Sequence, residues 1–186
     1  MLFQIVSLLL EVVVGLVAGT CLLRFYMQQQ AIPLSSRSNP LGRFVFALTD
    51  WIVLPLRRAL PNSGRMDAAS LLAAFLLELL QYGVLWMLSG GHSSLVAVLL
   101  LALFGLVRLT ISGLSGLVMV YAILSWMPAR SPLYDMLERL VNPPLVPIRR
   151  ALPLIGGVDL SPLVLLLMLQ VAVIVLGHVQ AAVMMF

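Results

Sequence analysis

The stretch Pro-Leu-Arg-Arg-Ala-Leu-Pro at residues 55–61 decides the fold, because it returns as Pro-Ile-Arg-Arg-Ala-Leu-Pro at residues 147–153. The shift of 92 residues continues without a gap, and 11 of the 28 residues in 40–67 are identical to their counterparts in 132–159. Each copy precedes a long apolar run, at 68–88 and at 160–183. The chain therefore contains two tandem units, each an apolar helix, an arginine-bearing loop and a second apolar helix.

Composition places these helices in a membrane. The chain is 62% hydrophobic and 10% charged, whereas a soluble domain has about 25% charged residues. A bilayer is the solvent that suits so much apolar surface, and it admits helices because their backbone groups are satisfied internally. The predicted fold is an all-α polytopic membrane protein with two parallel repeats and four transmembrane helices. The first repeat spans residues 1–90 and the second spans 91–186.

Three spans are evident from the apolar runs at 2–23, 69–88 and 162–183. Each is close to the roughly 20 residues that a helix needs to cross. The stretch 93–126 is longer and allows several structures. It can form one tilted helix that extends beyond the bilayer, a short outer helix followed by one span, or two short helices broken near Arg108.

The arginines favour one crossing within 93–126. All 11 basic residues are arginine, with six in 24–65, four in 130–150, and Arg108 between them. Loops that carry the basic residues stay on the cytoplasmic side. One crossing puts both arginine loops on that side, whereas two crossings would separate them. We therefore expect cytoplasmic loops and both termini outside.

Each arginine loop is predicted to contain an amphipathic helix in the headgroup plane. After Pro132, apolar residues recur at helical spacing at positions 133, 136, 137, 140 and 141, and a more apolar version follows Pro40. Such a helix lies at the membrane surface with its apolar face toward the acyl chains. We expect Pro55 to end the first helix, and Pro144 and Pro147 to end the second.

The double arginines are the candidate contact residues, namely Arg57, Arg58, Arg149 and Arg150. Three interpretations are open. The arginines can act only as topology signals, they can bind anionic lipid or a partner, or they can form salt bridges to Asp67 and Asp159. Rigid prolines frame both pairs, which favours guanidinium groups held in fixed places. We therefore predict one cytoplasmic surface for partner or lipid contact, with Asp67 and Asp159 in structural salt bridges.

Three ionisable residues fall inside the predicted spans. Glu11 and Glu78 lie about 17–20 Å from the cytoplasmic ends of their helices, near the membrane centre. Alignment of the two repeats places Arg108 opposite Leu10, again at mid-depth. Charged groups at this depth are costly and are functional candidates. They predict a buried cluster that either holds the helices together or forms part of an ion or proton path.

The sequence offers no pattern for catalysis or for a bound cofactor. His92 and His178 are isolated, and a metal or haem site usually requires more ligands. We expect no enzyme activity, no metal, no cofactor and no nucleic-acid partner. The basic charge belongs to the flank of a membrane.

The chain resembles the bacterial YggT family in its two-repeat form. The resemblance rests on motifs in both copies: Arg-Phe-Tyr-Met-Gln at 24–28, Asn39-Pro40, residues 55–61 with Asp67, Ala-Ile-Leu-Ser-Trp at 122–126, Ser131-Pro132, and residues 147–153 with Asp159 to Pro162. It implies a multi-pass protein of the bacterial inner membrane. Family members are associated with cell division, envelope organisation and tolerance of osmotic or ionic stress, and the family is similar to plastid proteins of cytochrome assembly.

Two functions follow as hypotheses. The first is a non-enzymatic scaffold or assembly factor for membrane or envelope complexes, which contacts lipid headgroups and either a membrane-protein partner or further copies of itself. The second is a role in ion or osmotic homeostasis through transport, which rests on the intramembrane charges and on an internal repeat of the kind found in transporters.

Four crossings with cytoplasmic arginine loops place the carboxyl terminus outside. Fusion of alkaline phosphatase after residue 186 should be active, and fusion of a cytoplasmic fluorescent reporter at the same point should be dark. The opposite pattern would contradict this topology and would require another number of crossings.

Overall fold

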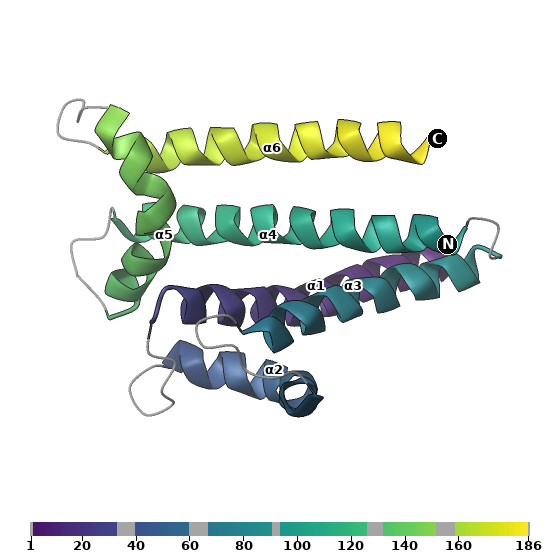
Figure 1. Cartoon of the computed structure of the whole chain (residues 1–186). Coiled ribbons are helices and arrows are strands. Elements are labelled where there is room, and N and C mark those ends of the chain that lie inside the picture. Colours follow the sequence, from purple (N-terminus) through teal and green to yellow (C-terminus); the bar gives the residue numbers. More distant parts are fainter. Residues whose placement is uncertain are drawn as a thin grey trace. The chain divides into compact units, whose positions relative to one another are not determined.

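The computed structural model describes residues 2–32, 40–59, 67–90, 94–125, 132–151 and 159–185, and its regular structure in these ranges is helical (Figure 1). The elements are α1 Leu2–Gln29, α2 Pro40–Ala59, α3 Ala68–Leu88, α4 Leu95–Ser125, α5 Pro132–Ala151 and α6 Ser161–Met184. The predicted all-α class is confirmed. Each repeat contributes a long helix, a 20-residue amphipathic helix and a second long helix.

Four of these helices are long and apolar enough to cross a membrane, namely α1, α3, α4 and α6. The ambiguous stretch forms one continuous helix, α4, of 31 residues. Its length is about 46 Å, so it exceeds a hydrocarbon core of about 30 Å and must tilt or extend beyond it. A break near Arg108 is excluded.

The first compact unit is residues 1–110. Its core joins Val14, Ala18 and Cys21 of α1, Val53 of α2, and a run of small or apolar residues on α3 (Ala69, Ala73, Ala74, Leu77). Alanines at the contact let α1 and α3 approach closely, which is how transmembrane helices gain van der Waals packing. The first half of α4 joins this unit, with Leu106 and Leu109 against the core.

The second compact unit is residues 111–186. Its core joins Val118 and Tyr121 of α4 to Leu165 of α6 through three buried residues of α5 (Leu137, Val141, Leu145). Figure 1 shows α5 lying across the beginning of α6 rather than along it. The boundary between the two compact units thus falls inside α4, although the sequence repeat starts anew before that helix.

The expectation that prolines end the amphipathic helices is wrong. Helix α2 continues through Pro55 to Ala59, and α5 continues through Pro143, Pro144 and Pro147 to Ala151. An interior proline costs about 3 kcal/mol because it removes a backbone hydrogen bond. Here the turn beyond each proline is held from outside, since Leu56 and Ile148 pack on the two cores. Both double arginines therefore lie in a last helical turn and not in a loop.

The predicted apolar face of α5 is mostly buried, with Met136, Leu137, Leu140 and Val141 inside the protein and Leu133 at its surface. Helix α2 has one buried side and one exposed apolar side. It buries Val45, Thr49 and Val53 and exposes Phe44, Trp51 and Leu54. Thr49 lies on the buried side, where its hydroxyl accepts a hydrogen bond from Arg24 of α1.

Candidate functional site: an arginine–aspartate clamp in each repeat

The first arginine of each pair is clamped to an aspartate ten residues later. In the first repeat, both Arg57 Nε and a terminal nitrogen donate to the carboxylate of Asp67, with 3.3 Å between Nε and Oδ1. In the second repeat, Arg149 Nε lies 2.8 Å from Asp159 Oδ2. The end of each amphipathic helix is thereby fixed to the start of the next span. We call this ion pair between an arginine and an aspartate the clamp.

Each clamp aspartate also organises the first turn of its span. Asp67 is the N-cap of α3, and its carboxylate accepts from the Ser70 backbone N–H at 3.4 Å and from the Ser70 hydroxyl at 2.7 Å. Asp159 accepts from the backbone N–H of Ser161 at 2.9 Å. A carboxylate at this position satisfies an otherwise unpaired N–H and suits the positive end of the helix.

In the first repeat a further arginine, on α1, lies close to the clamp aspartate. Arg24 of α1 is 2% exposed and binds Thr49 Oγ1 and Asp50 Oδ1, each at 2.7 Å. Its Nε lies 3.8 Å from Asp67 Oδ2, and its guanidinium carbon lies 4.8 Å from the centre of the Phe46 ring. One buried cation therefore ties α1 to both α2 and the start of α3.

In the second repeat aromatic and amide groups take the supporting role. Arg149 donates to the Tyr121 hydroxyl at 3.1 Å and to Asn142 Oδ1 at 3.2 Å. Tyr121 stacks on Tyr134 with ring centres 5.4 Å apart. In the first repeat Gln28 Oε1 accepts from Arg57 at 3.2 Å, so an oxygen from the preceding span completes both clamps.

The clamps keep their charges at neutral pH. Burial raises the pKa of Asp67, but hydrogen bonds from Arg57 and Ser70 outweigh it, and the pKa lies below its usual value. The pKa of Asp159 is lowered in the same way, with burial outweighed by Ser161 and Arg149. Depressed carboxyl pKa values contribute stability above the usual carboxyl range, and that stability is lost as pH falls through the folded-state pKa.

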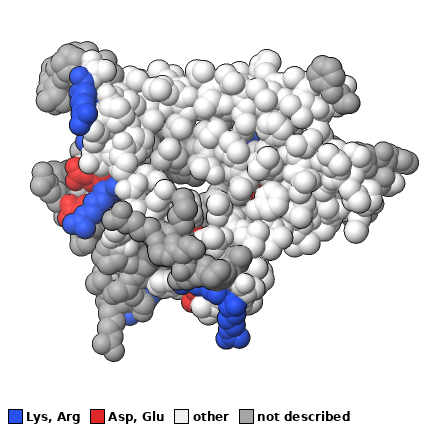
Figure 2. All heavy atoms as spheres, viewed as in Figure 1, with Lys and Arg blue, Asp and Glu red and all other residues white. Residues whose placement is uncertain are grey.

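The second arginine of each pair has a different environment. Arg58 and Arg150 are exposed, and neither makes a hydrogen bond or ion pair with the residues that the structure describes. Neighbouring helical residues are about 100° apart around the axis, so clamping one arginine directs the next one away from the core. Figure 2 shows charged side chains over α5, while the visible side of α6 carries none.

The three predicted intramembrane charges all lie in the first unit. Glu78 of α3 is 5% exposed, whereas Glu11 of α1 and Arg108 of α4 lie at the surface. Glu78 interacts electrostatically with both Arg108 and Glu11. The structure thus brings the three groups into electrostatic range, with the carboxylate of Glu78 on the inside.

A close helix approach surrounds Glu78. Gly105 of α4 faces the Glu78 carboxylate and the Tyr82 ring so closely that any β-carbon at position 105 would collide with them. The sequence does not predict this contact, because a single glycine in an apolar helix gives no signal until its neighbours are known. The roles of Arg24, Gln28 and Tyr121 are also not predictable from the sequence, because these residues lie far along the chain from the clamps they support.

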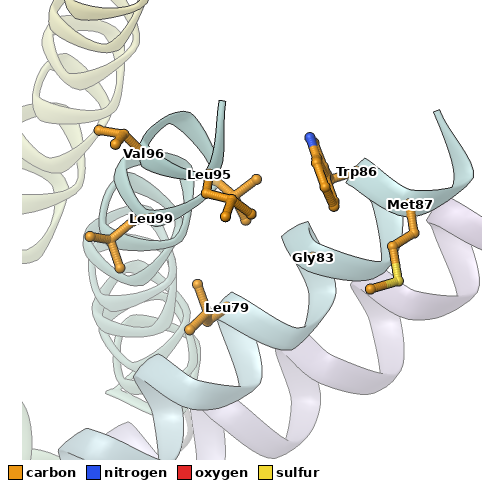
Figure 3. Close-up of a pocket in the computed structure, with 8 residues that line it drawn as sticks. Leu79, Gly83, Trp86, Met87, Leu95, Val96 and Leu99 are labelled. Atoms are coloured by element: carbon orange, nitrogen blue, oxygen red, sulfur yellow. The ribbon is translucent and has the colours of Figure 1, made fainter. Parts of the chain in front are cut away.

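An apolar cavity of about 470 Å³ opens between the end of α3 and the start of α4. In Figure 3, Leu79 and Trp86 of α3 face Leu95 of α4 across it. The lining residues share an apolar character apart from the indole N–H, and they are Leu79, Gly83, Trp86, Met87, Leu95, Val96, Val98 and Leu99. No acid, base or nucleophile is among these lining residues.

No cluster of metal-binding side chains occurs in the described parts of the chain. His178 lies at the surface of α6, with its Nδ1 2.8 Å from the Ile174 carbonyl oxygen. His92, and Asn39 and Ser131 of the family motifs, lie outside the described residues. Ser161 is the first residue of α6, and Leu160 is its N-cap.

The two clamps differ in burial, so removing each one should lower the free energy of unfolding by a different amount. Asp67 is fully buried, whereas Asp159 and Arg149 are 31% and 32% exposed. Asp67→Ala removes the carboxylate that binds Arg57 and leaves buried Arg24 with Asp50 as its remaining carboxylate, and it should cost about 3–5 kcal/mol. Asp159→Ala should cost about 1.5–3 kcal/mol, the value of a charged hydrogen bond. Thermal unfolding of purified protein in detergent measures both.

Asp135→Ala is the matched control, because Asp135 lies exposed in the first turn of α5. It should change stability by less than about 0.5 kcal/mol. Equal losses for Asp67→Ala and Asp159→Ala would contradict the difference in burial as the cause.

Comparison with known proteins supports one family across both repeats. The family model described as CCB3/YggT matches residues 1–88 and again 93–180. The chain is 37% identical to the Escherichia coli strain K12 protein described as "Uncharacterized protein YggT", over 89% of this chain and 85% of that one. It is 38% identical to a Vibrio alginolyticus protein described as "Uncharacterized protein in proC 3'region", over 76% and 78%.

A further relative, described as an uncharacterized protein of Pseudomonas aeruginosa, is 31% identical over 80% of this chain and 76% of its own length. No solved structure matches the chain. Four apolar helices, a double arginine repeated in register and a family match over each repeat lead to one conclusion: the chain belongs to the CCB3/YggT family of membrane proteins.

Proposed function

We propose that the protein is a non-enzymatic scaffold or assembly factor of the inner membrane, and that α2 and α5 present its contact arginines. The proposal rests on the difference between the two arginines of each double-arginine motif. Arg57 and Arg149 are clamped, while Arg58 and Arg150 are exposed beside them. The same presentation occurs in both repeats although the supporting residues differ.

A topology signal alone does not require this geometry. The positive-inside preference depends on which side the arginines occupy and not on their orientation. A guanidinium that recognises phosphate or carboxylate needs a fixed position, because its donors form a rigid planar fork. The clamps supply that position by holding the last turn of each amphipathic helix.

Anionic lipid headgroups or an acidic face of a membrane-protein partner fit these arginines. Each arginine near an anionic surface contributes about 1 kcal/mol, so Arg58 and Arg150 alone provide weak binding. Helix α2 adds exposed Phe44, Trp51 and Leu54, which are the apolar and aromatic side chains that enter the interface from an in-plane helix. Both arginine helices then face the cytoplasm, as the arginine count predicts.

The exposed arginines can be moved without disturbing the clamps. Arg58→Ala with Ala59→Arg, together with Arg150→Ala and Ala151→Arg, keeps the net charge and shifts each guanidinium around the helix. Ala59 and Ala151 are exposed, so they accept the larger side chain. We expect normal topology and abundance but loss of complementation in a deletion strain.

Arg58→Lys with Arg150→Lys serves as the control, because it keeps charge and position but removes the planar fork. Partial complementation by this control would indicate charge-dependent lipid contact. Full complementation by the moved arginines would contradict a docking role and reduce them to orientation signals.

Ion or osmotic homeostasis through transport is the second candidate, and the environment of Glu78 favours it. This carboxylate is 5% exposed inside a membrane span and lies in electrostatic range of Arg108 and Glu11. Ionisable groups at membrane depth mark ion or proton paths in many transporters. A cluster that only joins helices has the same appearance, so a functional measurement must separate the two.

Arg108→Leu should lower the amount of protein in membranes, because it removes the positive charge that interacts with the buried Glu78 carboxylate. Adding Glu78→Gln should restore part of the loss. A harmless Arg108→Leu would contradict the pairing. If Arg108→Leu with Glu78→Gln restores the amount but abolishes proton or ion flux in proteoliposomes, the transport candidate is favoured over the scaffold.

A further inference from the structure

Helix α6 carries an exposed amide in the middle of a membrane span. Gln170 lies nine residues after the start of α6 at Ser161, or about 14 Å along the helix. Its side chain is exposed and makes no hydrogen bond with the described residues. A carboxamide in hydrocarbon has no water to bind, so a protein partner for it is strongly favoured.

Gln170 lies at the centre of a regular stripe. Residues Leu163, Leu167, Gln170, Ile174, Gly177 and Ala181 are separated alternately by four and three positions. This spacing produces the seam of a left-handed helix pair. The apolar members are well exposed, at 56% for Leu163, 60% for Leu167 and 56% for Ile174. We call these six residues the α6 seam.

The α6 seam has room for a second helix. A β-carbon at Gly177 would meet nothing within 4 Å, and the small Gly177 and Ala181 permit close backbone approach. Within its own unit α6 packs on α5 near its beginning, where Leu165 is buried on another face. The seam runs on beyond that contact.

The corresponding residue in the first repeat is buried rather than exposed. Glu78 aligns with Gln170 at the repeat shift of 92 residues, and it is buried against neighbouring helices. A mid-span polar group at this place in the repeat is thus covered by helices in the first unit. Gln170 in the second unit also requires a partner for its polar group, and its side chain is uncharged.

We propose that the α6 seam pairs with the α6 seam of a second copy of this chain, with the two Gln170 side chains hydrogen-bonded across the centre. A second copy is the occupant that fits, because a carboxamide both donates and accepts and is its own complement. A two-fold axis brings the same residues together from both sides. A glutamate at this position would instead repel its copy.

Cysteine cross-linking of the full-length protein in native membranes tests the pairing. The background carries Cys21→Ala, since Cys21 is the one native cysteine. Leu167→Cys and Ile174→Cys should form dimers under mild oxidation. Met168→Cys is the matched control, because it is 58% exposed at nearly the same depth but lies on the opposite side of α6.

Substitution of Gln170 then tests the hydrogen bond. Gln170→Leu should raise the monomer–dimer dissociation constant about three- to tenfold, and Gln170→Asn should retain more of the dimer. Membrane abundance should not fall with Gln170→Leu, because leucine inserts more readily than glutamine. This keeps a folding defect separate from a pairing defect.

Three outcomes would overturn the proposal. Equal cross-linking through Met168→Cys would place the contact on another face. Monomers at every position would mean that lipid or another part of the same chain covers the seam. Cross-links only to a different protein would assign the seam to a foreign helix. The cross-linking does not depend on Arg58 or Arg150, so it can fail while the proposed docking function holds.

Discussion

The clamp between an arginine and an aspartate ten residues apart is the interaction on which the rest of each repeat depends. It connects the end of an amphipathic helix to the start of a membrane span, and its aspartate also accepts a backbone hydrogen bond from the first turn of that span. Because Arg57 and Arg149 are held in the last turn, α2 and α5 can continue through prolines that would otherwise end them. The same constraint leaves the neighbouring arginine pointing away.

The two repeats preserve this interaction with different supporting chemistry. The first uses a buried cation, Arg24, which balances two carboxylates and binds a threonine hydroxyl. The second uses the hydroxyl of Tyr121 and the amide of Asn142 around a more exposed pair. Two different environments thus hold the first arginine of each pair against an aspartate ten residues later.

The membrane explains where the remaining polar groups lie. In water an exposed mid-helix charge or amide is unremarkable, but in hydrocarbon each one needs a partner. Glu78 is buried beside Gly105, and its carboxylate interacts electrostatically with Arg108 and Glu11. Gln170 has no hydrogen-bond partner in the described chain, and its self-complementary amide is the basis of the proposed pairing with a second copy.

The sequence alone determined the all-α class, the tandem repeat, the four apolar spans and the family, because hydrophobic runs of span length and a motif repeated in register are local properties. Charge counting also favoured a single crossing by α4. Tertiary structure decided which arginine of each pair is clamped, that α2 and α5 continue beyond their prolines, and that Arg24 and Tyr121 support the clamps. These outcomes depend on side chains that are distant in sequence and meet only in the fold, where buried charges must find partners because no water is present to solvate them.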